Sequence, residues 1–137
     1  MLKRDYLIKQ FEEFGKVLGA ILGLKNEGNL SQLNDMIREA AQKYAASEID
    51  FVEMIPDELL LSTLTDEKKL TDEQLKMLGD LLFEKAEYYL ASNAPETRSL
   101  NCYKKSKRIY SFLKEHATIN FSLDMHYKLE LLAKMGL

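Results

Sequence analysis

The chain has 137 residues but only one cysteine, two histidines and no tryptophan. With Cys102 alone, no disulfide can form within the chain. Metal sites need clusters of Cys, His or carboxylate ligands, and the sequence has no HExxH pair, Cys/His cluster or calcium loop. Leucines stand three residues before His116 and His126, so the Glu-x-x-His motif of di-iron bundles is missing too. We expect no metal and no other cofactor.

Catalytic motifs are also scarce. No G-x-S-x-G nucleophile elbow is present. Lys104 and Lys105 could lower the pKa of Cys102, but no histidine is close enough in sequence to act as its base. A lone cysteine on a packed helix usually serves as a small hydrophobic residue. The sequence therefore predicts no enzymatic activity.

Long apolar runs and a strong net charge are absent as well. The longest uncharged stretch near the N-terminus is 17–24, far short of the ~20 residues that span a bilayer. Asp5, Glu12 and Glu13 lie where a signal peptide would need an apolar run. The net charge of −3 is too small to indicate nucleic acid as a partner. We expect no membrane span and a cytoplasmic protein.

What is present favours one all-α domain over 1–137, built of antiparallel helical hairpins with about six helices and no sheet. Apolar residues recur three and four positions apart, and no segment alternates with a period of two. The clearest helix start is at Thr71, where Gln74 completes a capping box. Helices are predicted over 3–24, about 30–44, about 56–64, from 71 to about 92, from about 96 to 116, and after Ser122.

The spacing also predicts which residues face inward. Leu7 to Ile21 form a heptad-like seam in the first helix, and Leu59-Leu60-Leu61 should be largely buried. The other inward stripes are Leu30, Leu33, Ile37, Ala40 and Tyr44; Leu75, Leu78, Leu82, Ala86 and Tyr89; Leu100, Tyr103, Tyr110 and Leu113; and Leu123, Tyr127, Leu131 and Met135.

Part of this pattern resembles a tetratricopeptide repeat, which places small residues where two helices touch. Leu75-x2-Leu78-Gly79-x2-Leu82 matches the first helix of that repeat, and Ser99-x3-Tyr103-x2-Ser106 matches the second. The stretch between them is longer than in the standard repeat. A tetratricopeptide-like array and a plain antiparallel bundle therefore both remain open.

Most of the chain also resembles small all-helical bacterial proteins of uncharacterised function. The resemblance is carried by Arg4-Asp5-Tyr6-Leu7, Leu70-Thr71-x2-Gln74-Leu75-x2-Leu78-x-Asp80-Leu81-Leu82, Tyr110-x-Phe112-Leu113 and Phe121-Ser122-Leu123. It implies a tetratricopeptide-like helical fold, and it implies no catalytic residue, cofactor or partner.

Three glycines, Gly15, Gly19 and Gly23, lie within the first predicted helix. Each costs a helix interior about 1 kcal/mol relative to alanine. Close approach of another helix, from this chain or a second copy, would offset that cost. Alternatively, the helix ends near Gly19 or Gly23, or this segment lies on a membrane surface.

The sharpest local feature is the acid-free segment 98–114, which carries six Lys or Arg residues. One interpretation is that the acidic preceding helix neutralises it in solvent. Another is a basic face that binds an unknown protein or an acidic peptide, so the sequence predicts a protein–protein interaction module. A nucleic-acid-associated regulator and a homo-oligomer assembled through the first helix are the alternatives. The predicted contact residues are Arg98, Lys104, Lys107 and Arg108.

Overall fold

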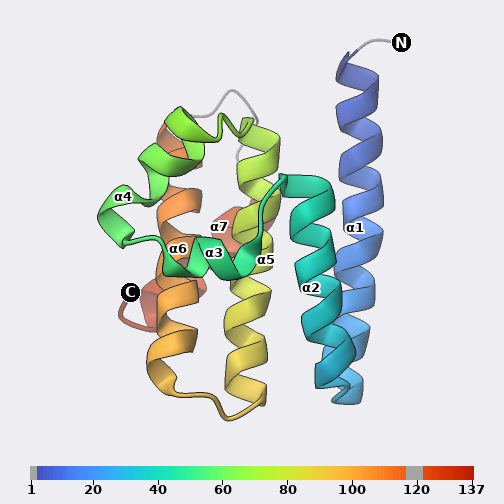
Figure 1. Ribbon diagram of the computed structural model, residues 1–137, viewed down its shortest axis with the longest axis vertical. Helices are drawn as coiled ribbons and strands as arrows, with labels where there is room; N and C mark the ends of the chain where they lie inside the picture. Colours follow the sequence, from blue (N-terminus) through green and yellow to red (C-terminus); the bar gives the residue numbers. More distant parts are fainter. Residues whose placement is uncertain (1–2, 117–121) are drawn as a thin grey trace.

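The computed structural model describes residues 3–116 and 122–137, and every regular element within them is helical (Figure 1). The all-α prediction is confirmed for these residues. None of their helices is both long enough and apolar enough to cross a membrane. The elements are α1 (Lys3–Glu27), α2 (Leu30–Ala45), α3 (Ile49–Met54), α4 (Asp57–Ser62), a π-helical segment η1 (Thr63–Glu67), α5 (Asp72–Ala91), α6 (Glu96–His116) and α7 (Leu123–Lys134).

The α5–α6 hairpin forms the centre of the fold. Thr71 caps α5 in the predicted capping box: its hydroxyl accepts from the Gln74 amide, and the Gln74 side chain accepts from the Thr71 amide. Gly79 and Ser106 meet where the two helices touch, and the Ser106 hydroxyl donates to the Gly79 carbonyl at 2.8 Å. The contact between small residues that the tetratricopeptide-like spacing predicts is therefore present between α5 and α6.

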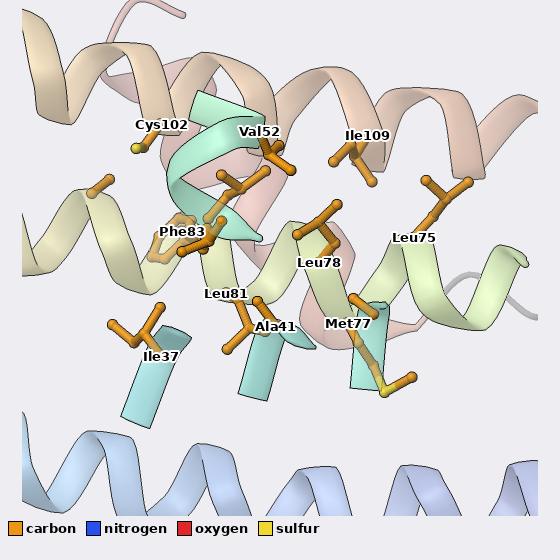
Figure 2. Packing of buried hydrophobic residues seen from close by; sticks show 14 of the residues in the cluster. Ile37, Ala41, Val52, Leu75, Met77, Leu78, Leu81, Phe83, Cys102 and Ile109 are labelled. Atoms are coloured by element: carbon orange, nitrogen blue, oxygen red, sulfur yellow. The ribbon is translucent and has the colours of Figure 1, made fainter. Parts of the chain in front are cut away.

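A second hairpin, α1–α2, covers the opposite side of α5 (Figure 1). Asn29 caps α2 through its side chain, and Leu33, Ile37, Ala40 and Tyr44 of the predicted stripe are buried, while Leu30 is partly buried. Figure 2 shows α5 between α6 and α2, with side chains from all three meeting in one core. This core confirms the inward faces predicted for α2 and α5, and that of α6 except at Leu100, which is only partly buried.

The heptad-like seam of α1 packs within its own chain. Phe14 and Ile21 are buried, and Phe11 and Leu18 pack against the core from its edge. The side chain of Leu7 lies outside the described residues. Since this seam already has intramolecular partners, a homo-oligomer could not use it without opening the fold.

The three glycines of α1 lie on its outer side, and neither of the intramolecular explanations for them holds. The helix continues through all three to Glu27, so none of them ends it. A Cβ atom added at Gly15, Gly19 or Gly23 would meet nothing within 4 Å, so no helix of the described chain approaches them closely. Close approach by a second copy and a place on a membrane surface both stay predictions.

The segment between the hairpins contains a helix that the sequence did not reveal, α3, followed by α4 and η1. Ile55 is extended before Pro56, as its position before a proline predicts. The prediction for the three leucines was only partly right, because Leu60 is buried and Leu61 half-buried but Leu59 is 52% exposed. A short helix that packs with one side leaves its other side in solvent.

The face predicted for α7 was wrong. Leu123 is 87% exposed, Tyr127 60% and Met135 44%, whereas Met125 and Leu132 are buried. Of the predicted stripe, Leu131 alone packs against the core, and it is only partly buried. A step of four residues rotates by 400°, so a stripe of such steps drifts by about 40° at each step and leaves any single face. An ion pair fixes the observed orientation: Lys128 Nζ lies 3.3 Å from Oδ1 of the buried Asp80 on α5.

Candidate functional site

The four residues predicted to bind a partner do not share one surface. Lys104, Lys107 and Arg108 line an open groove of about 550 Å³ between α6, α4 and the end of the described chain. Arg98 lies two helical turns earlier and on a different side of α6, in a separate cluster described below. Three of the four predicted residues therefore lie along one groove and Arg98 does not, and that they contact a partner stays a prediction.

The groove combines an apolar surface with charged edges. Leu61, Phe112 and Leu137 supply its apolar part. His116 also lines it, with its ring stacked on Phe112 at 4.8 Å between centroids. Asp57 and Glu115 are the acidic groups among its lining residues.

Lys105 lies between the groove lysines in sequence but points inward. Its Nζ donates to the Ile55 carbonyl at 2.6 Å and lies 2.7 Å from Asp57 Oδ1, and the side chain is almost fully buried. Arg108 Nε lies 3.9 Å from the other oxygen of the same carboxylate. Asp57 is therefore largely committed to Lys105, and it neutralises the groove only in part.

Lys104 and Lys107 have no ion pair with any residue in the described part of the chain. Counting only the charged side chains of the lining, three cations (Lys104, Lys107 and Arg108) face two carboxylates (Asp57 and Glu115), so 3 − 2 leaves a side-chain surplus of +1. The groove thus offers two lysine ammonium groups beside an apolar surface, an arrangement that complements a segment carrying both acidic and apolar side chains.

Arg98 belongs to a tightly bonded cluster on the side of α6 that faces α3. Its guanidinium stacks on the Tyr89 ring at 4.3 Å and donates to the Tyr89 hydroxyl at 2.6 Å. That hydroxyl in turn donates to Glu53, whose carboxylate lies 3.6 Å from Arg98. Burial, and then the Glu53 carboxylate, raise the pKa of Tyr89. Arg98 is thus engaged within its own chain, which weakens it as a contact residue.

Lys85 of α5, which the sequence did not single out, lies at the centre of this cluster. It is 2% exposed, and it donates to the side-chain carbonyl of Asn34 on α2. Its Nζ lies 3.5 Å from Asp50 and 4.0 Å from Glu53, both on α3. Burial lowers the pKa of Lys85, and the two carboxylates offset that effect only in part. Its partners are more than thirty residues away in the chain, so local patterns gave no signal for this cluster.

The remaining candidates are a buried thiol and a surface histidine. Cys102 is buried, and burial together with Glu53 raises its pKa to about 12, although nearby lysines act in the opposite direction. His126 lies on the surface with Glu130 at 2.9 Å. Residues 3–116 and 122–137 contain no group of three or more His, Cys, Asp or Glu that could hold a metal ion.

Comparisons of the chain with protein-family models, with curated proteins and with solved structures gave no significant match. The resemblance to small helical bacterial proteins therefore stays a prediction.

Proposed function

We propose that this chain is a non-enzymatic interaction module that binds an acidic segment of another protein in the groove along α6. The observation that carries the proposal is the pair Lys104 and Lys107, which have no ion-pair partner in the described chain and lie beside Leu61, Phe112 and Leu137. A tetratricopeptide-like use of the hairpins as a scaffold for such a groove, in the cytoplasm, is part of the same proposal.

Binding of useful affinity requires both the charged and the apolar part of the groove. An exposed ion pair contributes about 0.2–1 kcal/mol and is weakened by salt. Two such pairs alone would give very weak binding. Apolar contact contributes about 25 cal/mol for each Å² buried, so a segment with a leucine or phenylalanine next to its acidic residues fits the groove better than a purely acidic one.

The test measures binding of fluorescent peptides that combine Glu with Leu or Phe, and of matched peptides in which Lys replaces Glu. We expect the acidic peptides to bind, and the double variant K104E/K107E to lose that binding. The control K9E/K16E makes the same change of charge on α1, away from the groove, and should bind as the wild type does. Equal binding by both variants would contradict the proposal.

Nucleic acid is the alternative ligand for the same basic side chains of the groove. Asp57 and Glu115 would repel phosphates there, and the surplus of lining charge is only +1. A titration with duplex DNA and with RNA at two salt concentrations distinguishes the two. Binding that weakens steeply as salt rises and is lost in K104E/K107E would replace the peptide proposal with this one.

A further inference from the structure

We propose that the polar pocket at the junction of α2, α3, α5 and α6 binds a small oxyanion, a phosphate or carboxylate group, between Lys85, Arg38 and Arg98. The pocket has a volume of about 160 Å³. A water molecule occupies about 30 Å³ in the liquid, so the space holds about five waters, or a group the size of phosphate. This site is separate from the α6 groove and does not depend on the proposed function.

The first argument is a count of charges. Three cations, Arg38, Lys85 and Arg98, share two carboxylates in this cluster. Asp50 lies 2.8 Å from Arg38 and 3.5 Å from Lys85. Glu53 lies 4.0 Å from Lys85 and 3.6 Å from Arg98. Within the described residues, 3 − 2 leaves one positive charge without a matching carboxylate.

The second argument is the hydrogen bonding of Lys85. An ammonium has three donors, and Asn34 accepts from one of them at short range. Charge-assisted N–H···O bonds are normally about 2.7–2.9 Å long. The Asp50 and Glu53 oxygens at 3.5 and 4.0 Å are therefore too distant to take full hydrogen bonds from the other donors. A nearly fully buried ammonium with donor capacity to spare thus lines the pocket.

The remaining walls suit an oxyanion in shape and access. The rings of Tyr88 and Tyr89 lie 5.1 and 5.2 Å from Lys85 Nζ and restrict where a ligand can lie. The side chains of Arg38 and Arg98 are 51% and 55% exposed, so the two guanidiniums flank an entrance that solvent reaches. Guanidinium groups bind phosphate and carboxylate through paired donors.

The protonation of buried lysines supports the same conclusion. For Lys128, burial alone would lower the pKa, but Asp80, Asp124 and Glu84 outweigh it and raise the pKa. For Lys85, burial prevails over Asp50 and Glu53, and Arg38 adds to the lowering. Unlike Lys128, Lys85 is thus undercompensated by its carboxylate partners, and a bound anion would supply the missing stabilisation of its charge.

The first experiment is a thermal unfolding series of the whole chain with inorganic phosphate, and separately with acetate, at an ionic strength held constant with sodium chloride. We expect a saturable rise in the unfolding midpoint, about 5 °C at ten times the Kd. The variant R38Q/R98Q should lose this rise. The control K104Q/K107Q removes the same charge from the groove and should keep it. No rise with either anion, or an equal rise in both variants, overturns the proposal.

A second measurement uses the wild-type chain and so does not depend on how the variants fold. In a nitrogen–proton NMR titration, phosphate should shift the backbone signals around Asn34, Lys85 and Arg98 and raise the pKa of the Lys85 ammonium. Small shifts spread evenly over the chain, with an unchanged Lys85 pKa, would refute the site. Peptide binding in the α6 groove is measured independently, so either proposal can fail while the other stands.

Discussion

The substitution Gly79→Ala tests the close contact between α5 and α6. A Cβ atom added at Gly79 would lie 2.9 Å from Cε1 and 3.3 Å from Cδ1 of Tyr110, and 3.3 Å from Cγ2 of Ile109. The Tyr110 ring cannot easily move away, because it is fully buried and its hydroxyl donates to the buried Asp80. The helices must separate instead, which stretches the bond from Ser106 to the Gly79 carbonyl.

Two opposing effects set the magnitude. Alanine improves helix propensity by about 1 kcal/mol over glycine. Extra volume in a well-packed core costs about 1–3 kcal/mol, and a contact at 2.9 Å with a restrained ring lies toward the upper part of that range. We expect the free energy of unfolding of the Gly79→Ala variant to fall by about 1–2 kcal/mol.

Gly19→Ala is the matched control, since it makes the same change inside a helix where nothing lies within 4 Å of the new Cβ. Only the propensity effect applies there, so this variant should be more stable than the wild type by up to about 1 kcal/mol. Urea unfolding followed by circular dichroism gives both values. A Gly79→Ala variant as stable as the wild type would refute the close α5–α6 contact. Destabilisation by Gly19→Ala would show that a second copy covers the outer face of α1.

Three further predictions follow from buried groups. Lys105→Ala should lower the free energy of unfolding by about 1–3 kcal/mol, because it leaves the Ile55 carbonyl and Asp57 without their donor. Lys104→Ala, one residue away and exposed, should change it by less than about 0.5 kcal/mol. Similar values for the two variants in chemical denaturation would contradict the inward orientation of Lys105. Cys102 should react with iodoacetamide only after unfolding, because it is buried and its pKa is raised to about 12; rapid labelling of the native chain at pH 8 would show that the thiol is accessible. Burial and a neighbouring carboxylate raise the pKa values of Tyr89, Tyr103 and Tyr110 above 10.0. Above that pH the unfolded chain loses protons that the folded chain keeps, so a pH series of urea unfolding should show stability falling as the pH rises above about 10. Constant stability from pH 9 to 11 would argue against this.

Sequence reasoning succeeded where a few neighbouring residues determine the structure. The capping box at Thr71 depends on four consecutive positions, so its residues identify it wherever the helix packs. The contact of Gly79 with Ser106 was predictable because only small side chains allow two helices to approach so closely. Stripes that step by alternating threes and fours, as in α2, stay on one side of a helix and were assigned correctly.

The same reasoning failed for α7, because its stripe of four-residue steps drifts around the helix. Leu129 and Leu132 follow Met125 by steps of four and three, and these residues pack inward together with Leu131. The apolar residues of α7 fit two faces, and the buried Asp80 on α5 decides between them through Lys128. Tertiary context supplied that choice.

Buried charge was the feature that the sequence hid most completely. Asp80, Glu84 and Lys85 are all buried on α5, although a helix packed on one side would expose them. Helices lie around α5 on several sides, and each of these charges has a partner on a different one: Lys128 on α7, Lys25 on α1 and Asp50 on α3. Asp80 also pairs with Lys76 one turn earlier on α5, at 2.6 Å. That pair is local in sequence, but the partners on other helices are dozens of residues away, so no local motif indicates them.

The basic segment of α6 shows why one sequence feature can have two roles. Arg98 and Lys105 are seven residues apart, almost two full turns, so they lie on one side of the helix, and they pair with Glu53 and Asp57. One interpretation of the sequence expected the preceding helix to supply the neutralising acids. For these two residues the acids come from the α3–α4 region instead. Lys104 and Lys107 lie on the other side, along the groove. Substitution of Lys105 therefore tests folding, substitution of Lys104 and Lys107 tests peptide binding, and substitution of Arg98 tests the anion pocket.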